Sequence, residues 1–287
     1  MKVGFLGTGL MGLPMAQRLL DANIELIVYN RTPSKLEGLQ AAGAAIAEHP
    51  DQAIRMCECV ILMLTNASAI RSVLLSDSSR QQLAGRTVIQ MGTITPTESR
   101  AIREEVVAAG GDYLEAPVLG SIPEAKAGKL IVMVGGSPEQ FQHWLNLLQY
   151  FGSEPLLIGS VGTAAAVKLA LNQLIASLSA AFALSIGFVQ QQGIDIDLFM
   201  KILRGSVLYA PTFDKKLQRM LDRNYSDANF PTKHLMKDTD LFITEAKSVG
   251  LNVSSIEGVR KILEMALNTA SEEDYSSIYS VINPEEL

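Results

Sequence analysis

The sequence predicts an α/β domain with a doubly wound, mostly parallel sheet, followed by an all-α C-terminal domain joined to it by a long helix. Short apolar segments alternate with helical segments in the first half of the chain, which is typical of a parallel sheet covered on both faces. A glycine-rich turn follows the first apolar segment, and no convincing strand follows residue 161. We therefore expect domains at residues 1–161 and 162–287.

The expected strands are short and rich in Val, Ile and Leu on both faces. They are Lys2–Leu6, Glu25–Tyr29, Cys59–Leu64, Thr87–Met91, Asp112–Ala116, Leu130–Val134 and Leu156–Ile158. Helices expected between them include Leu10–Leu20, Pro33–Ala42, Pro96–Ala109 and Pro138–Phe151. The second domain is expected to contain helices Thr163–Gln192, Asp195–Leu203, Thr212–Arg223, Thr232–Val249, Ser255–Asn268 and Tyr275–Val281.

Composition excludes several classes of protein. A net charge of −6 argues against a nucleic-acid-binding protein, because neutralising phosphates requires a basic face. The C-x-C pair Cys57 and Cys59 lies in a strand-like segment, which indicates buried free thiols in a reducing compartment. The chain enters a strand within two residues of Met1, which leaves no room for a targeting peptide, so we expect a cytoplasmic protein.

The stretch Leu169–Ile194 lacks charged residues and is long enough to cross a membrane. Polar residues such as Asn172 and Gln173 are scattered through it, so we expect a helix buried in protein and no membrane association. Its uncharged faces exceed what one small helical domain can cover. We therefore expect a homodimer or homotetramer formed through the C-terminal domain.

The strand–turn–helix at residues 3–12 carries the G-x-G-x-x-G pattern of a Rossmann-type dinucleotide site. Gly7 allows the tight turn, Gly9 lets the backbone approach a pyrophosphate, and Gly12 lets the helix pack on the strand. The N-terminus of that helix favours phosphate binding. The alternative is a plain strand–helix turn.

The residues after the second strand favour NADP(H) over NAD(H). This position carries a carboxylate in many NAD enzymes, but here it reads Asn30-Arg31-Thr32. Arg31 can pair with a 2′-phosphate and Thr32 can donate a hydrogen bond to it. The alternative is that Arg31 points to solvent.

Lys168 is the best candidate for proton transfer, because it lies near the start of the long uncharged helix and beside the expected domain boundary. Asn172 follows one turn later on the same face, where it can direct the lysine or bind the same substrate oxygen. The alternative is an ordinary lysine at a helix end. His49, His143 and His234 share no ligand-like spacing, so no metal site is expected.

The segment Glu115–Leu130 is rich in Gly and Pro and leaves the end of a predicted strand. Ligands of open parallel sheets bind outside such strand ends. Exposed N–H groups around Gly120 and Ser121 are therefore candidates for holding a small carboxylate.

Four motifs together resemble the β-hydroxyacid dehydrogenases over essentially the whole chain. Residues 3–12 are similar to the cofactor fingerprint of that family, and Glu115–Leu130 to its substrate-binding segment. Residues 162–172 resemble its catalytic helix G-x-G-x-x-x-K-x-x-x-N, and Lys237-Asp238 its Lys-Asp pair. The resemblance implies Lys168 as the general acid/base and Asn172 as its partner.

Within that family, Asn30-Arg31-Thr32 and the run from Phe230 to Asp238 resemble the glyoxylate/succinic semialdehyde reductases. The cofactor contacts that this resemblance implies are Gly7, Gly9, Leu10, Met11, Gly12, Asn30, Arg31, Thr32, Leu64, Thr65, Thr93 and Lys237. The implied substrate contacts are Thr93, Leu119, Gly120, Ser121, Lys168, Asn172, Phe230 and Asp238.

Two positions depart from the family pattern. Leu119 replaces a serine that helps to hold the substrate carboxylate, and Ala164 replaces the second glycine of the catalytic motif. We expect NADPH-dependent reduction of small aldehyde acids to hydroxy acids. Two alternatives remain open: a dehydrogenase of 3-hydroxyisobutyrate or another 3-hydroxy acid, and a dinucleotide-binding sensor without activity.

Overall fold

A computed structural model describes residues 1–284. The chain divides into two compact units, Met1–Leu169 and Ala170–Leu287, and each has its own hydrophobic core. The division falls inside one continuous helix, α9 (Thr163–Gln191), whereas the sequence places the domain boundary just before this helix.

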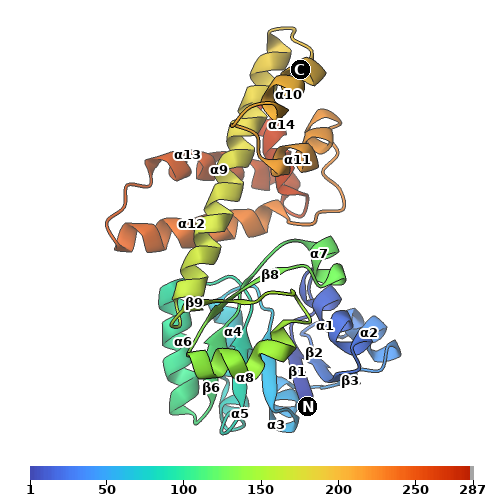
Figure 1. Cartoon of the computed structure of the whole chain (residues 1–287), viewed down its shortest axis with the longest axis vertical. Coiled ribbons are helices and arrows are strands. Elements are labelled where there is room, and N and C mark those ends of the chain that lie inside the picture. The colour runs from blue at the N-terminus through green and yellow to red at the C-terminus, as the bar shows by residue number, and fades with distance from the viewer. Residues whose placement is uncertain (285–287) are drawn as a thin grey trace. The chain divides into compact units, whose positions relative to one another are not determined.

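The first unit is built on a nine-stranded sheet (Figure 1). Its strand order is β3-β2-β1-β4-β5-β6-β8-β7, with β9 paired to β8. All pairs from β3 to β6 are parallel, and β8 runs antiparallel to β6 and β7. In chain order the strands are β1 (Lys2–Leu6), β2 (Glu25–Tyr29), β3 (Ala45–Ile46), β4 (Cys59–Leu62), β5 (Thr87–Gln90), β6 (Asp112–Glu115), β7 (Val118–Leu119), β8 (Ile131–Gly135) and β9 (Leu156–Gly159).

Helices cover both faces of this sheet, as the apolar strands predict. Alternate residues of β4 enter different cores: Ile61 packs with α1 (Gly12–Asp21) and α8 (Pro138–Leu148) on one face. Leu62 belongs to the core on the other face, which α3 (Pro50–Met56), α4 (Ala67–Leu74) and α6 (Pro96–Ala108) cover. The predicted doubly wound, mostly parallel fold is confirmed.

Several short elements depart from the sequence-based assignment. The predicted helix Pro33–Ala42 is a 3-10 turn, η1 (Pro33–Leu36), followed by α2 (Glu37–Ala41). The patterns do not predict β3, β7, α3, α4 or α5 (Asp77–Arg80), because elements of two to eight residues are too short to establish a period. The expected loop Glu115–Leu130 also contains a helix, α7 (Ile122–Ala127).

Within residues 170–284 the second unit is helical, apart from an isolated bridge between Pro231 and Asp274 (Figure 1). Its elements after α9 are α10 (Ile196–Arg204), α11 (Pro211–Leu221), α12 (Thr232–Ser248), α13 (Ser254–Ala270), η2 (Tyr275–Ser277) and α14 (Ile278–Ile282). These helices surround buried residues of α9 such as Phe182 and Ile186.

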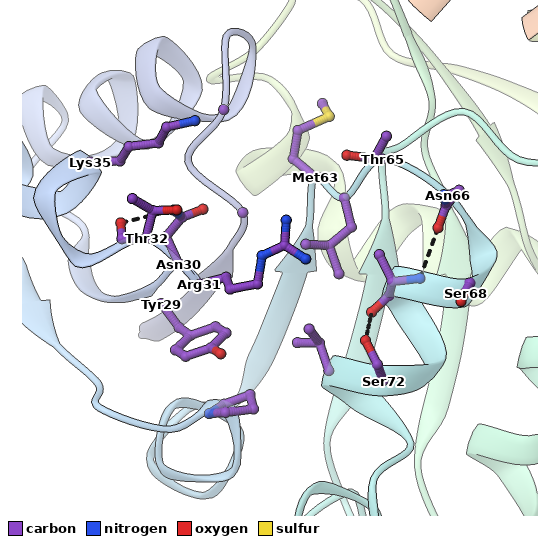
Figure 2. A pocket seen from close by; sticks show the side chains of 16 residues that line it. Tyr29, Asn30, Arg31, Thr32, Lys35, Met63, Thr65, Asn66, Ser68 and Ser72 are labelled. Carbon is purple, nitrogen blue, oxygen red and sulfur yellow. Dashed lines mark hydrogen bonds between the residues drawn. The ribbon is translucent and has the colours of Figure 1, made fainter. Parts of the chain in front are cut away.

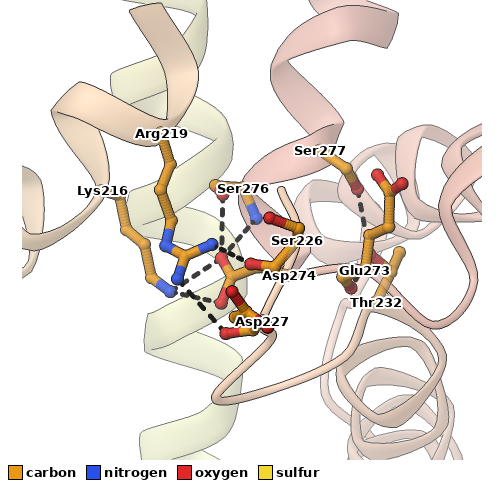
Figure 3. Close-up of polar contacts among 9 residues, drawn as sticks. All are labelled: Lys216, Arg219, Ser226, Asp227, Thr232, Glu273, Asp274, Ser276 and Ser277. Carbon is orange, nitrogen blue, oxygen red and sulfur yellow. Dashed lines mark hydrogen bonds and ion pairs between the residues drawn. The ribbon is translucent and has the colours of Figure 1, made fainter. Parts of the chain in front are cut away.

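A buried ion pair holds part of this unit together (Figure 3). Lys216 on α11 donates to both carboxylate oxygens of Asp274 at 2.7 and 2.8 Å, and its ammonium lies 4.1 Å from the centre of the Tyr275 ring. Asp274 also accepts hydrogen bonds from the amide and hydroxyl of Ser276. One carboxylate therefore joins α11 to the start of η2.

Helix α9 is the one helix in residues 1–284 whose length and composition would allow it to cross a membrane. In its most apolar 18-residue window, 44% of the residues are buried within the chain. The same helix exposes Leu174, Leu184 and Phe188. It therefore contributes to the core of the second unit and also presents apolar side chains outward.

Candidate active site

The glycine turn has three distinct steric environments. Gly7 has φ +102°, and a Cβ there would lie 2.3 Å from the Met63 carbonyl oxygen. A Cβ on Gly12 would lie 1.9 Å from the Gly7 carbonyl oxygen. Gly9 has no described atom within 4 Å of its Cβ position. The fold therefore requires a residue without a Cβ at Gly7 and Gly12, because a Cβ there would collide with the backbone. Gly9 instead leaves open space beside the N-terminus of α1.

Asn30 connects this turn to the segment after β2. Its side-chain oxygen accepts a hydrogen bond from the Thr8 amide at 3.2 Å, and its amide nitrogen donates to the Thr32 carbonyl at 3.0 Å. In the sequence Asn30 stands where many NAD enzymes carry a carboxylate. In the structure its amide also holds the loop that carries Arg31 against the glycine turn.

A cavity of about 620 Å³ opens beside the turn (Figure 2). It is lined by seven of the predicted cofactor contacts: Gly7, Gly9, Asn30, Arg31, Thr32, Leu64 and Thr65. Figure 2 shows the Arg31 side chain extending from the loop after β2 toward the middle of this pocket. The Arg31 side chain lines the pocket and is also exposed to solvent.

The pocket also contains residues that sequence reasoning missed. They are Tyr29, Lys35, Pro50, Met63, Asn66, Ser68, Ala69, Ser72 and Val73. Lys35 lies one turn beyond Thr32, and Asn66 caps α4 by accepting the Ala69 amide at 2.8 Å. None of the pocket's lining residues within 1–284 is acidic, whereas Arg31 and Lys35 are cationic. The pocket is therefore suited to an anion.

Other predicted cofactor contacts do not line this cavity. Gly12 is buried against the Gly7 carbonyl, and Leu10 and Met11 lie just before α1 and do not line the pocket. Thr93 follows β5, in a loop that Gln90 braces through hydrogen bonds to the Gly92 amide (2.5 Å) and carbonyl (3.0 Å). Lys237 belongs to the second unit.

The predicted substrate loop differs from the expectation of exposed donors. Gly120, at φ +137°, links β7 to α7, and Ser121 precedes that helix. The amide and hydroxyl of Ser121 both donate to Glu124 Oε2, at 2.8 and 2.6 Å. These donors are therefore engaged in a capping box, which the spacing Ser121-x-x-Glu124 could have predicted. Leu119 lies on β7, and the proposed substrate contacts of this loop remain predictions.

Lys168 and Asn172 both lie on α9, four residues apart, a spacing that places side chains on one face of a helix. Asn172 is buried, and its Nδ2 donates to Asp238 Oδ2 at 2.6 Å. The other carboxylate oxygen of Asp238 lies 2.8 Å from Lys237 Nζ. The structure therefore brings together Asn172, Lys237 and Asp238 of the second unit.

The hydrogen bond to Asp238 fixes the orientation of the Asn172 amide, because only the amide nitrogen can donate to a carboxylate. Asn172 Oδ1 is then a buried acceptor with no hydrogen-bond partner among residues 1–284. Buried acceptors are normally paired, so this oxygen is suited to a donor such as an ammonium or a substrate hydroxyl.

The segment before α12 supplies the remaining predicted contact. Phe230 packs edge-on against Tyr275, with ring centres 5.8 Å apart. Burial, reinforced by the positive charges of Lys237 and Lys233, lowers the pKa of His234. In residues 1–284 no three His, Cys, Asp or Glu side chains are grouped as a metal site would require.

Comparison with known families matches both halves of the chain. Residues 2–162 match the NAD-binding domain of 6-phosphogluconate dehydrogenase, and residues 162–282 match the NAD-binding region of NADP-dependent 3-hydroxyisobutyrate dehydrogenase. These matches support a nicotinamide dinucleotide as the cofactor.

Similar proteins align with nearly the whole length of this chain. Glyoxylate/succinic semialdehyde reductase 1 of Arabidopsis thaliana is 30% identical over 98% of this chain and 98% of its own length. 2-Hydroxy-3-oxopropionate reductase of Escherichia coli is 29% identical over 98% of this chain and 97% of its own. The structure of a 3-hydroxyisobutyrate dehydrogenase from Mycobacterium tuberculosis aligns with a TM-score of 0.89, covering 98% of each chain at 20% identity. The chain therefore belongs to the β-hydroxyacid dehydrogenase family and is an oxidoreductase that acts on CH–OH groups.

Proposed function

We propose that this enzyme reduces small aldehyde acids, such as glyoxylate or succinic semialdehyde, to hydroxy acids with NADPH. The observation that carries the proposal is the position of Lys168 on α9, one turn before an asparagine whose amide Asp238 holds in place. The names of the Arabidopsis relatives support this substrate class.

The pocket of the first unit fits a dinucleotide. The space at Gly9 is where a pyrophosphate can approach the backbone, and Arg31 and Lys35 provide cations for a 2′-phosphate. When bound, this cofactor supplies the hydride for the reduction.

Lys168 is the proposed proton donor. Its ammonium group would hydrogen-bond the carbonyl oxygen of the substrate and transfer a proton to it as the alcohol forms. Asn172 Oδ1 would accept a hydrogen bond from that ammonium or from the product hydroxyl. Asp238 acts on this step indirectly, by fixing the direction in which the amide points.

Steady-state rates test this assignment directly. The wild-type enzyme is assayed with glyoxylate, succinic semialdehyde and 3-hydroxyisobutyrate, each with both nicotinamide cofactors. We expect the highest kcat/KM for aldehyde-acid reduction with NADPH. Faster oxidation of 3-hydroxyisobutyrate would favour the dehydrogenase alternative. This alternative is tested because Leu119 on β7 replaces the family serine that helps to hold the substrate carboxylate. Tight cofactor binding with no turnover of any substrate would indicate a sensor.

Arg31→Ala is expected to weaken NADPH binding by about 10- to 100-fold and NADH binding by less than about 3-fold, since a charged hydrogen bond contributes about 1.5–3 kcal/mol. The dissociation constants are measured by titration of the protein with each cofactor. Arg103→Ala, which removes an exposed arginine from α6, is the control. Equal losses of affinity for both cofactors would show that Arg31 does not contact the 2′-phosphate.

The second unit is proposed to form a homo-oligomer. Its exposed apolar side chains include Leu184 and Phe188 on α9 and Leu198 and Ile202 on α10. Large exposed apolar patches are normally covered by a partner, and we propose that these side chains form one. Sedimentation velocity should show a dimer or tetramer, and Phe188→Glu should shift it toward smaller species. Met265→Glu, at an exposed position on α13, should not. A monomeric wild-type protein would exclude this proposal.

A further inference from the structure

Glu115, the last residue of β6, is a fully buried carboxylate that the proposed reaction does not use. Its Oε1 accepts three backbone hydrogen bonds, from Gly162 at 2.8 Å, Ala164 at 2.9 Å and Ala165 at 3.1 Å. All three amides lie at the start of α9, where helical N–H groups have no partner within the helix. A single side chain from the sheet therefore satisfies the first turn of the helix that carries Lys168.

The carboxylate is held from two other elements as well. Ser99 of α6 donates its hydroxyl to Glu115 Oε2, and the same hydroxyl lies 2.9 Å from the buried Tyr113 hydroxyl. On β8, a Cβ at Gly135 would lie 2.4 Å from Glu115 Oε1, so only a glycine leaves room for the carboxyl group. Burial raises the pKa of Glu115, while the hydrogen bonds from Ser99 and the three amides oppose that rise.

We propose that Glu115 is a positioning residue for the reaction, which fixes the first turn of α9 and thereby the place from which Lys168 extends. The inference depends on the proposed role of Lys168. Lys168 follows Ala165 by three residues, which is about 4.5 Å along a helix, so the attachment point and the lysine lie within one turn of each other. All the residues involved belong to the first unit.

The chemistry of the network provides a discriminating pair of variants. In Glu115→Gln the amide oxygen can still accept the three backbone bonds. The new NH₂ group can donate to Ser99, whose hydroxyl then donates to Tyr113. Glu115→Met has a similar length but accepts none of these bonds. The two variants therefore separate the attachment of α9 from the volume of the side chain.

We expect Glu115→Met to lower kcat for aldehyde-acid reduction by about 10- to 100-fold, because a misplacement of about 1 Å can reduce a rate by about 10²-fold. The KM for NADPH should change by less than about 2-fold, and Glu115→Gln should keep kcat within about 3-fold of wild type, since it retains the hydrogen bonds. Asp195→Ala is the control, because Asp195 also caps a helix, α10, through the amides of Asp197 and Leu198. A folded Glu115→Met enzyme with wild-type kcat would overturn the inference.

Amide hydrogen exchange at Gly162, Ala164 and Ala165 gives a second test that is independent of turnover. Ser99→Ala removes one bond to Glu115 and leaves the three backbone donors, so it should fold even where Glu115→Met does not. We expect faster exchange at these amides in Ser99→Ala and wild-type rates in Asp195→Ala. Unchanged exchange in Ser99→Ala would contradict the role of the carboxylate. Absence of turnover in the wild type would refute the proposed function instead, which distinguishes the two failures.

Discussion

Lys168→Ala is expected to lower kcat for the reduction of glyoxylate or succinic semialdehyde by about 10²- to 10⁴-fold, the usual contribution of a positioned general acid. The dissociation constant for NADPH should change by less than about 2-fold, because Lys168 is not among the residues that line the dinucleotide pocket. The loss would then appear in kcat and in kcat/KM equally. Steady-state kinetics and cofactor titration on the same preparation measure both quantities.

Lys261→Ala is a suitable control for this experiment. Lys261 is an exposed residue of α13, so its loss removes the same charge from the protein without changing α9. Its kcat should equal that of the wild type. A Lys168→Ala enzyme that retains near-normal kcat would exclude the lysine as proton donor, and water or another side chain would then have to supply the proton.

Asp274→Ala should produce the largest loss of stability, about 3–5 kcal/mol in the free energy of unfolding. Lys216 is buried, and its ammonium donates to the Asp274 carboxylate (Figure 3). The ammonium also lies 4.1 Å from the centre of the Tyr275 ring. Burial already lowers the pKa of Lys216 against the opposing effect of Asp274. Removing the carboxylate leaves a buried cation without a counter-charge. Denaturant titration monitored by circular dichroism measures the change.

The exposed pair of Arg204 and Asp214 provides a matched comparison. Its shortest N–O distance is 2.7 Å, the same as between Lys216 and Asp274, but both of its side chains are substantially exposed to water. Asp214→Ala should therefore cost much less than Asp274→Ala, since solvent screens surface pairs. Equal losses for the two variants would show that burial does not determine the importance of the Asp274 carboxylate.

The first unit could be predicted well from sequence because its signals are local. A strand, a glycine turn and a helix follow one another within residues 2–21, so their spacing predicts a dinucleotide site. The position after the second strand likewise predicts Arg31 as a cofactor contact, and Arg31 lines the pocket. Lys35 and Asn66 were missed, because their places in the pocket depend on the turn η1 and on the course of the chain after β4.

The spacing of residues could not predict contacts between residues that lie far apart in the sequence. The hydrogen bond from Asn172 to Asp238 joins residues 66 positions apart, and sequence alone gives each a role without linking them. Glu115 was treated as the start of a glycine-rich loop. It is buried because β6 ends beside the first turn of α9, which the sequence does not indicate. A carboxylate between two apolar residues, Leu114 and Ala116, was the available signal.

The three glycines of the first turn differ in what a mutation there would reveal. Side chains at Gly7 or Gly12 would collide with backbone atoms of the chain itself, so selection for folding alone preserves them. A Cβ at Gly9 would meet no described atom within 4 Å, so an alanine there would collide only with a molecule bound in the pocket. A descendant that stopped using its cofactor would be free to change Gly9 first, while keeping the other two. The identity of that one residue can therefore distinguish a retained enzyme from an inherited scaffold.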